Sequence, residues 1–203
     1  MGFSGSEPVM PTALKVLIAG GFGVGKTTMV GSVSEVVPLK TEERMTEVSR
    51  DVDDLSGVEN KSTTTVAMDF GRITVDRDLV LYLFGTPGQD RFWFMWDDLA
   101  LGALGAVVLA DTRRLETSFA AIDFFESRGI PFAVAVNCFH GRCGSTAEEV
   151  KAALDLDPGT PVILCDVRDR ESSKKVLLTV LNAARAHAEA AEAAVVPSSA
   201  GGF

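Results

Sequence analysis

The stretch GGFGVGKTT, residues 20–28, combines residue types that can hold the phosphate groups of a ligand. Its glycines allow backbone N–H groups to turn toward phosphate oxygens, and a helix that begins here adds a partial positive charge. Lys26 can reach the terminal phosphates as a point charge, and the Thr27 hydroxyl can bind Mg²⁺. The residues predicted to bind the phosphates are Gly20, Gly21, Phe22, Gly23, Val24, Gly25, Lys26, Thr27 and Thr28. The alternative is a glycine-rich turn of purely structural use.

Phosphate binding of this kind needs a buried strand before the glycines and a helix after them. Residues 13–20, ALKVLIAG, are an apolar run ended by glycine, which predicts a strand. Residues 25–36 predict a helix that starts at the last glycine. The sequence therefore predicts a P-loop, the phosphate-binding turn of nucleotide-binding proteins.

The rest of the chain alternates apolar runs with helical patterns. Strands are predicted at 62–75, 79–85, 104–111, 131–137 and 161–166, and helices at 115–129, 145–154 and 171–193. The short joint at 76–78 predicts an antiparallel hairpin, and Ser145 with Glu148 predicts a capping box. The fold class predicted is α/β, a mostly parallel sheet with one antiparallel strand and helices on both faces. Ligands of such sheets bind at the carboxyl ends of the strands.

Length and composition predict one domain over residues 13–194, with a flexible leader at 1–12 and a disordered tail at 195–203. Residues 38–61 are polar with little periodicity, which predicts a long mobile loop. The net charge of −9 argues against nucleic acid as a partner. No apolar run reaches the roughly 20 residues of a membrane helix, and no secretory signal is visible. We therefore expect a cytoplasmic protein with reduced cysteines and no integral membrane segment.

A second group of candidates follows the strand predicted at 79–85. A P-loop, a long polar segment, a threonine-bearing hairpin and the residues TPGQ, 86–89, together resemble the small Ras-like GTPases. More narrowly, FGTPGQDRF and VNCFHG resemble the bacterial gliding-motility type and the GTPases of actinomycete conservons, over residues 14–189. The resemblance implies a Ras-like P-loop NTPase fold, GTP/GDP and Mg²⁺ as cofactors, and a signalling switch with slow GTP hydrolysis. It also implies a roadblock-domain partner that stimulates hydrolysis, and a sensor kinase complex that could bring the chain to the membrane surface.

The same resemblance assigns roles to residues of the two switch loops. Thr65 would give Mg²⁺ a second hydroxyl, with the neighbouring threonines leaving the register open by one residue. Gly88 would offer its N–H to the γ-phosphate, and Gln89 would orient the attacking water. Gln89 and Lys26 are the catalytic candidates.

Two positions depart from the pattern of that family. Gly85 stands where an aspartate that helps to hold Mg²⁺ is expected, which predicts weak Mg²⁺ dependence and a mobile second switch. Thr64 stands where some motility relatives carry an arginine that stabilises the transition state. The cation would then come from Arg50 or Lys61, from a partner, or not at all.

The base end of the site departs from the family as well. NCFH, residues 137–140, replaces the guanine box N-K-x-D, and a neutral histidine offers one acceptor nitrogen in place of two carboxylate oxygens. The choice between GTP and ATP is therefore open. The Val167 N–H would meet the base, and Asp166 is either the missing acceptor or a cap at the strand end. The residues predicted to lie at the base are Asn137, His140, Cys165, Asp166 and Val167.

Four further interpretations stay open. Cys138, His140, Cys143 and Cys165 have the donor types of a zinc site, although their spacing matches no standard zinc module. The nucleotide could serve a scaffold that does not hydrolyse it. Asp111 would supply a carboxylate to an ATP-binding P-loop protein, or else cap the next helix or contact the base-side loops. The aromatic residues within 92–96 either fold inward or form a docking surface.

Overall fold

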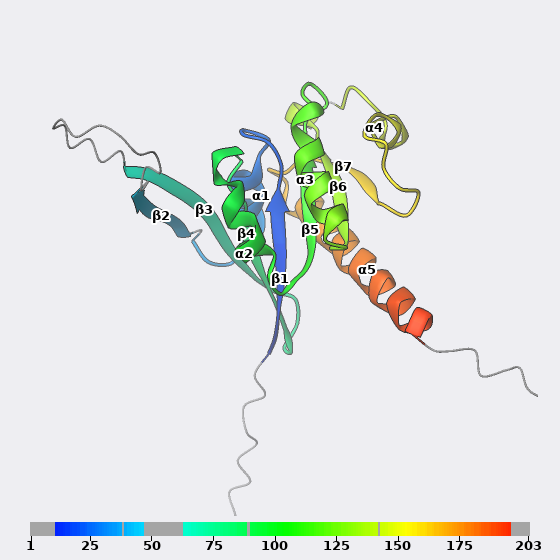
Figure 1. Cartoon of the computed structure of the whole chain (residues 1–203), viewed down its shortest axis with the longest axis horizontal. Helices are drawn as coiled ribbons and strands as arrows, with labels where there is room; N and C mark the ends of the chain where they lie inside the picture. Colours follow the sequence, from blue (N-terminus) through cyan, green and yellow to red (C-terminus); the bar gives the residue numbers. More distant parts are fainter. Residues whose placement is uncertain (1–10, 38, 47–62, 89, 142, 196–203) are drawn as a thin grey trace, which may run out of the picture.

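The chain alternates strands and helices to build one mixed sheet between two layers of helices. The computed structural model describes residues 11–37, 39–46, 63–88, 90–141 and 143–195. Within them the elements are β1 (Thr12–Ala19), α1 (Lys26–Val33), β2 (Leu39–Thr46), β3 (Thr63–Thr74), β4 (Leu79–Gly85), η1 (Asp90–Met95), α2 (Trp96–Ala100), β5 (Ala103–Ala110), α3 (Glu116–Ser127), β6 (Phe132–Asn137), η2 (Phe139–Gly141), α4 (Ala147–Ala153), β7 (Val162–Cys165) and α5 (Arg170–Val195) (Figure 1).

The sheet among the described residues has seven strands in the order β2-β3-β4-β1-β5-β6-β7. The five strands from β4 to β7 in that order run parallel to one another. β3 is antiparallel to both of its neighbours, β2 and β4. The predicted fold class is confirmed, including the hairpin of β3 and β4.

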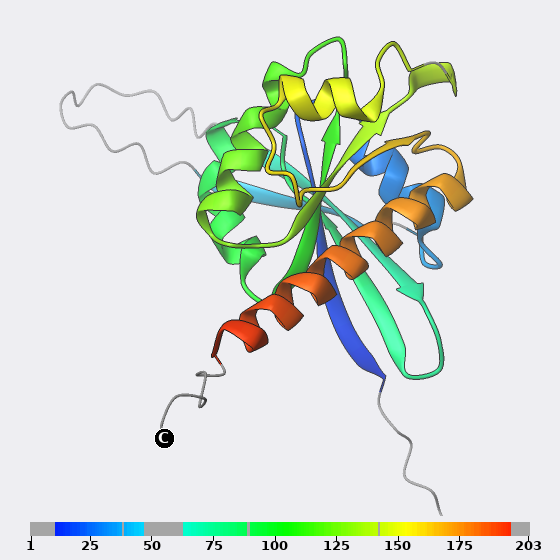
Figure 2. The same cartoon turned by 90° about the vertical axis from the view of Figure 1, so that its right-hand side faces the viewer.

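The core lies on both faces of the sheet because successive strand residues point to opposite sides. In β1, Val16 and Ile18 pack with Met29 of α1 and Val176 of α5. Leu17, the residue between them, packs in a second cluster with residues of α2, α3 and α4. Figure 2 shows α5 crossing one face of the sheet, with α3 on the other. Burial on both faces explains why these strands read as continuous apolar runs.

β2 is the strand that the sequence did not predict. Residues 39–46, LKTEERMT, were expected to belong to a polar loop, but they pair with β3 from Leu39 opposite Phe70 to Thr46 opposite Thr63. β2 is the terminal strand of the sheet, and edge strands are often polar because one side faces water. A polar edge strand has no apolar period to detect. The rest of the predicted loop, residues 38 and 47–61, lies outside the described residues, as do residues 1–10 of the leader and 196–203 of the tail.

Two helix ends differ from the prediction by a few residues. The capping box of α4 uses Thr146 and Glu149: the Thr146 hydroxyl accepts from the Glu149 N–H at 3.2 Å, and the Glu149 carboxylate accepts from the Thr146 N–H at 2.8 Å. The capping box was predicted one position too early, at Ser145 and Glu148. Ser145 and Thr146 are adjacent, and both residue types can cap a helix. α1 ends at Val33 because Ser34 has extended backbone angles. Among the described residues no helix is both long and apolar enough to cross a membrane.

Candidate nucleotide-binding site

The predicted P-loop follows β1 at the carboxyl edge of the sheet and leads directly into α1. Gly20 has a φ of 132°, and a Cβ built there would lie 2.4 Å from the carbonyl oxygen of Leu109 on β5. Gly25, the N-cap of α1, has a φ of 112°. Residues that carry a side chain rarely adopt these backbone angles, so the loop can take this shape only with glycine at both positions. The backbone before α1 therefore lies close against the neighbouring strand.

Lys26 is held at the centre of this loop by backbone oxygens. Its ammonium donates to the carbonyl groups of Gly20 and Gly21, each at 2.8 Å. Gly88, from the loop after β4, lies directly against it, since a Cβ built on Gly88 would be 2.5 Å from Nζ. Burial lowers the pKa of Lys26 to about 8, and the nearby Asp69 carboxylate acts in the opposite direction. The structure thus brings together Lys26 and Gly88, as the prediction requires.

A carboxylate that the sequence did not predict lies beside Thr27. The Thr27 hydroxyl donates to Asp69 Oδ2 at 2.6 Å. Asp69 on β3 is the register partner of Gly85 on β4. A Cβ built on Gly85 would lie 3.0 Å from Asp69 Cβ and 3.1 Å from Oδ2. A carboxylate from the neighbouring strand therefore lies in the space that a side chain at Gly85 would need.

The hairpin register could have revealed Asp69 from the sequence. Thr74 pairs with Val80 across the turn, and the same register carried back along both strands pairs Asp69 with Gly85. Thr65 lies on β3 as well, but four residues of extended strand, about 13 Å, separate it from Asp69. The side chain of Thr65 lies outside the described residues, so its role at Mg²⁺ stays a prediction. Gln89 lies outside the described residues.

Asn137 joins the P-loop to the loop after β7 at the base end. It is buried at the end of β6, its amide nitrogen donates to the Val24 carbonyl at 3.0 Å, and its amide oxygen accepts from the Val167 N–H at 3.4 Å. The Val167 N–H predicted to meet the base is therefore engaged by Asn137. His140 lies in η2, two residues after Cys138.

Asp166 and Cys165 form the turn between β7 and α5. The Asp166 carboxylate accepts from the Arg168 backbone N–H at 3.0 Å and from its guanidinium at 2.9 and 2.6 Å. This geometry matches the strand-end role of Asp166, and a base would have to compete with Arg168 for it. Burial, with the Asp166 charge, raises the pKa of the Cys165 thiol to about 12, so this sulfur stays protonated.

The cysteines differ from the expectation of three reduced thiols. Cys138 and Cys143 are joined in a disulfide that closes the loop containing η2, while Cys165 is free and buried. Two of the sulfurs considered for zinc are thereby used in a covalent bond. Among the described residues, no three His, Cys, Asp or Glu residues are grouped so as to hold a metal ion.

Asp111 faces the turn that follows β5. Its buried carboxylate accepts from the Arg113 N–H at 3.0 Å and from the Arg113 guanidinium at 2.8 and 2.7 Å. These hydrogen bonds hold the pKa of Asp111 below its usual range. Arg113 also lies over the Phe139 ring at 4.3 Å. Asp111 therefore caps this turn and not α3, whose N-cap residue is Leu115 and has no side-chain cap. Asp69 is the carboxylate beside Thr27.

The aromatic segment divides between the two expected roles. Trp96 is buried, donates to the Pro87 carbonyl at 3.3 Å and packs on Trp93, Phe124 and Phe125. Phe94 is 59% exposed. The inward aromatic rings anchor the segment that carries Gly88, and Phe94 is left on the surface.

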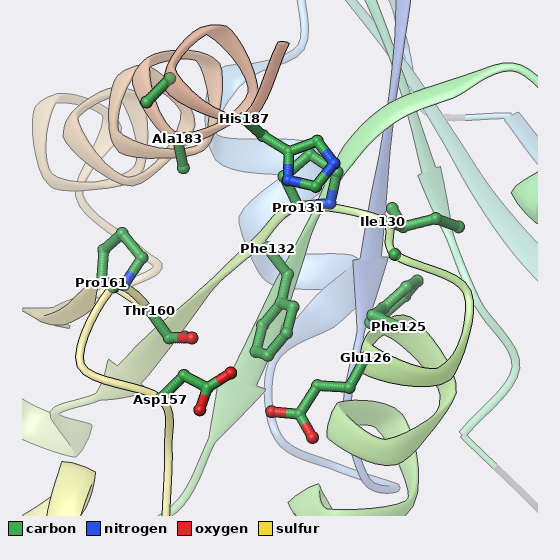
Figure 3. Close-up of a pocket in the computed structure, with 13 residues that line it drawn as sticks. Phe125, Glu126, Ile130, Pro131, Phe132, Asp157, Thr160, Pro161, Ala183 and His187 are labelled. Atoms are coloured by element: carbon green, nitrogen blue, oxygen red, sulfur yellow. The ribbon is translucent and has the colours of Figure 1, made fainter. Parts of the chain in front are cut away.

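A cavity of about 540 Å³ lies at the opposite edge of the sheet (Figure 3). It lies between the end of α3, the amino ends of β6 and β7, and α5. Glu126 and Asp157 point into it beside Phe132 (Figure 3). Burial and the charges of Asp157, Asp123 and Asp155 raise the pKa of Glu126. This acidic cavity contains no predicted site residue and would repel phosphate.

Replacing Asn137 with alanine is expected to lower the free energy of unfolding by about 2–4 kcal/mol, because a buried N–H and a buried carbonyl lose their partner. Urea unfolding measures the change. Asn182→Ala, on the exposed face of α5, is the matched control and should stay within about 0.5 kcal/mol. Equal stability of the two variants would show that Asn137 does not link the loops.

A glycine-rich loop, a central lysine and a threonine–carboxylate pair at the carboxyl edge of a mostly parallel sheet define a nucleotide-binding P-loop protein. Residues 18–187 match the model of the family described as conserved hypothetical ATP binding protein. The chain belongs to this family.

Individual proteins resemble this chain in sequence or in fold. The uncharacterized protein MJ1339 of Methanocaldococcus jannaschii is 31% identical over 126 residues, which are 61% of this chain and 69% of that protein. The apo cytosolic domain of the T. maritima FeoB iron transporter has a TM-score of 0.60 at 17% identity, covering 86% of this chain and 65% of that structure. The G domain of the same transporter has a TM-score of 0.55 at 18% identity, covering 87% and 99%. At these identities the two structures establish a G-domain type of fold and nothing further.

Proposed function

We propose that the protein is a small GTP-binding regulatory switch of the bacterial gliding-motility and conservon type, cycling between GTP and GDP. One contact carries the proposal: the backbone of Gly88 lies against the Lys26 ammonium. Lysine of a P-loop reaches the β- and γ-phosphates. A γ-phosphate must therefore enter where Gly88 now lies, so the loop that carries Gly88 takes different positions with GTP and with GDP.

Mg²⁺ fits the oxygen donors that Thr27 and Asp69 place side by side. Both are hard oxygen ligands of the kind that Mg²⁺ prefers, and the space at Gly85 is filled by the carboxylate itself. When bound, the ion neutralises charge on the β- and γ-phosphates. Thr27 and Asp69 would hold it, Lys26 would bind the phosphate oxygens, and Gln89 would orient the attacking water. Thr65 would join as a second hydroxyl only after β3 has rearranged.

Hydrolysis is proposed to be slow. The transition-state cation of some relatives is replaced by Thr64, and Arg50 and Lys61 lie outside the described residues. A roadblock-domain protein is the proposed partner that accelerates hydrolysis, and the exposed Phe94 beside the Gly88 segment supports a protein contact there. We place this switch in the cytoplasm, at the membrane surface only through a sensor kinase complex.

An ATP-binding protein is the second candidate. The description of the family favours it, and the Asp166 carboxylate, one candidate acceptor for guanine, is bonded to Arg168. A nucleotide-holding scaffold without hydrolysis is the third. Such a scaffold would make the same contacts to the phosphates as the switch and would differ from it only in not hydrolysing the nucleotide.

Calorimetry with GTP, GDP and ATP in the presence of Mg²⁺ separates these candidates. The switch predicts that GTP and GDP bind at least about tenfold more tightly than ATP, a difference of about 1.4 kcal/mol. It also predicts slow phosphate release that a roadblock-domain protein accelerates. Tighter binding of ATP would replace the proposal by the second candidate, and tight GTP binding without any phosphate release would replace it by the third.

A further inference from the structure

Arg114 lies in the turn between β5 and α3 and reaches back to the P-loop. Its guanidinium Nη2 donates to the Phe22 carbonyl at 3.2 Å. A Cβ built on Gly23 would lie 3.8 Å from the same nitrogen. An arginine from a distant part of the sequence therefore contacts the backbone segment that wraps the phosphates.

Asp111 orients this arginine without holding it tightly. The Asp111 carboxylate is bonded to Arg113 at 2.7 Å and lies 3.8 Å from Arg114 Nη2. The Arg114 side chain is 48% exposed. Its guanidinium is thus directed toward the P-loop and still has room to change rotamer.

The space beside Arg114 opens on the side where the γ-phosphate would enter. A cavity of about 340 Å³ is bounded by the P-loop, by Gly88 and Trp93, and by Arg114 with the first turn of α3. Gly88 also packs on Gly21, since a Cβ built on Gly88 would lie 3.2 Å from the Gly21 carbonyl. The same cavity therefore touches the P-loop, the glycine expected to bind the γ-phosphate, and a guanidinium.

We propose that Arg114 is the transition-state cation of triphosphate hydrolysis, supplied by the chain itself; this inference rests on the proposed function. Backbone N–H groups of a P-loop lie about 3 Å from the phosphate oxygens. A rotation of the Arg114 side chain moves its guanidinium from the Phe22 carbonyl to the γ-phosphate. Its planar fork can bind two oxygens at once.

The step that Arg114 assists is a simple hydrolysis. The water oxygen forms a bond to the γ-phosphorus while the bond from that phosphorus to the β–γ bridging oxygen breaks. The products are a nucleoside diphosphate, inorganic phosphate and a proton. Negative charge spreads over the γ-phosphoryl and bridging oxygens during this step, and Arg114 stabilises it where Lys26 alone would not.

Single-turnover phosphate release tests the proposal in the full chain loaded with Mg²⁺ and the triphosphate that it binds most tightly. Arg114→Ala is expected to slow release by about 100-fold, the usual effect of losing one such donor. Affinities for the di- and triphosphate should change by less than about threefold, because the contact forms fully only in the transition state. Arg114→Lys keeps one donor for the Phe22 carbonyl but not the fork, so it should bind nucleotide normally and remain slow. The control, Arg185→Ala, removes an exposed arginine of α5 and should match the wild type.

A second readout does not depend on turnover. The wild type should form a complex of the diphosphate with aluminium fluoride, detected through the fluorescence of Trp93 in the cavity, and Arg114→Ala should not. An Arg114→Ala rate equal to that of the wild type overturns the inference and leaves the switch in place. Equal loss of di- and triphosphate affinity with an unchanged rate also overturns it, because Arg114 would then only hold the loop. Absence of hydrolysis in the wild type overturns both.

Discussion

Replacing Lys26 with alanine is expected to weaken triphosphate binding by about 100-fold or more, as befits a charge-assisted contact to phosphate. The ammonium is already fixed by the carbonyl groups of Gly20 and Gly21, so little side-chain freedom is lost when phosphate binds. Calorimetry with the triphosphate measures the loss. Lys174→Ala, which removes an exposed lysine paired with Glu171 on α5, is the matched control. Unchanged triphosphate affinity in Lys26→Ala would show that the glycine-rich stretch is a turn of purely structural use.

The same lysine makes binding depend on pH. Burial lowers the pKa of Lys26 to about 8, and a bound triphosphate favours the charged form and raises that pKa. Affinity should therefore be constant below about pH 7 and fall by up to about tenfold for each pH unit above 8. The residual binding of Lys26→Ala should lack this decline. A decline that persists in the variant would assign the titration to another group.

Replacing Asp69 with alanine is expected to remove the Mg²⁺ dependence of nucleotide affinity. The wild type should bind triphosphate about 10–100-fold more tightly with Mg²⁺ than with a chelator, and Asp69→Ala should bind equally in both. Thr27 alone then has no carboxylate beside it. The sequence predicted weak Mg²⁺ dependence because it took account of Gly85 alone. The Asp69 carboxylate on β3 bonds Thr27 and lies against Gly85, so we expect a stronger dependence.

Exchanging the two positions provides the control for that prediction. Asp69→Ala combined with Gly85→Asp moves the carboxylate from β3 to its register partner on β4, and should restore most of the Mg²⁺ dependence. Gly85→Asp alone would press a new side chain against Asp69, with Cβ atoms 3.0 Å apart, and should lower the free energy of unfolding. Full Mg²⁺ dependence in Asp69→Ala would show that Asp69 is only a hydrogen-bond partner of Thr27.

The parts of this fold that were predictable are those with local signals. The P-loop has a fixed spacing of glycines and lysine between a strand and a helix, and each buried strand has a continuous apolar run. β2 has no such signal because an edge strand needs only backbone pairing. Thr146 was missed by one position because adjacent Ser and Thr give the same local pattern.

The site residues that belong to one short segment could be predicted from the sequence. Those that come from separate segments could not. Lys26 and Thr27 belong to the motif itself, whereas Asp69 enters only through the register of β3 and β4. Arg114 is more than 90 positions from Phe22 in the sequence and gives no signal of its own. The disulfide of Cys138 and Cys143 depends on how the loop folds back after β6. Long-range pairing of this kind cannot be read from composition or periodicity.

Three side chains bind backbone carbonyl groups of the P-loop between Gly20 and Val24. Lys26 binds the carbonyl groups of Gly20 and Gly21, Arg114 binds that of Phe22, and Asn137 binds that of Val24. Side chains at positions such as Phe22, which is 70% exposed, can therefore diverge in evolution without disturbing the loop. Substitution tolerance across this loop should follow backbone geometry, with glycine required at Gly20 and Gly25 and wide freedom at Phe22.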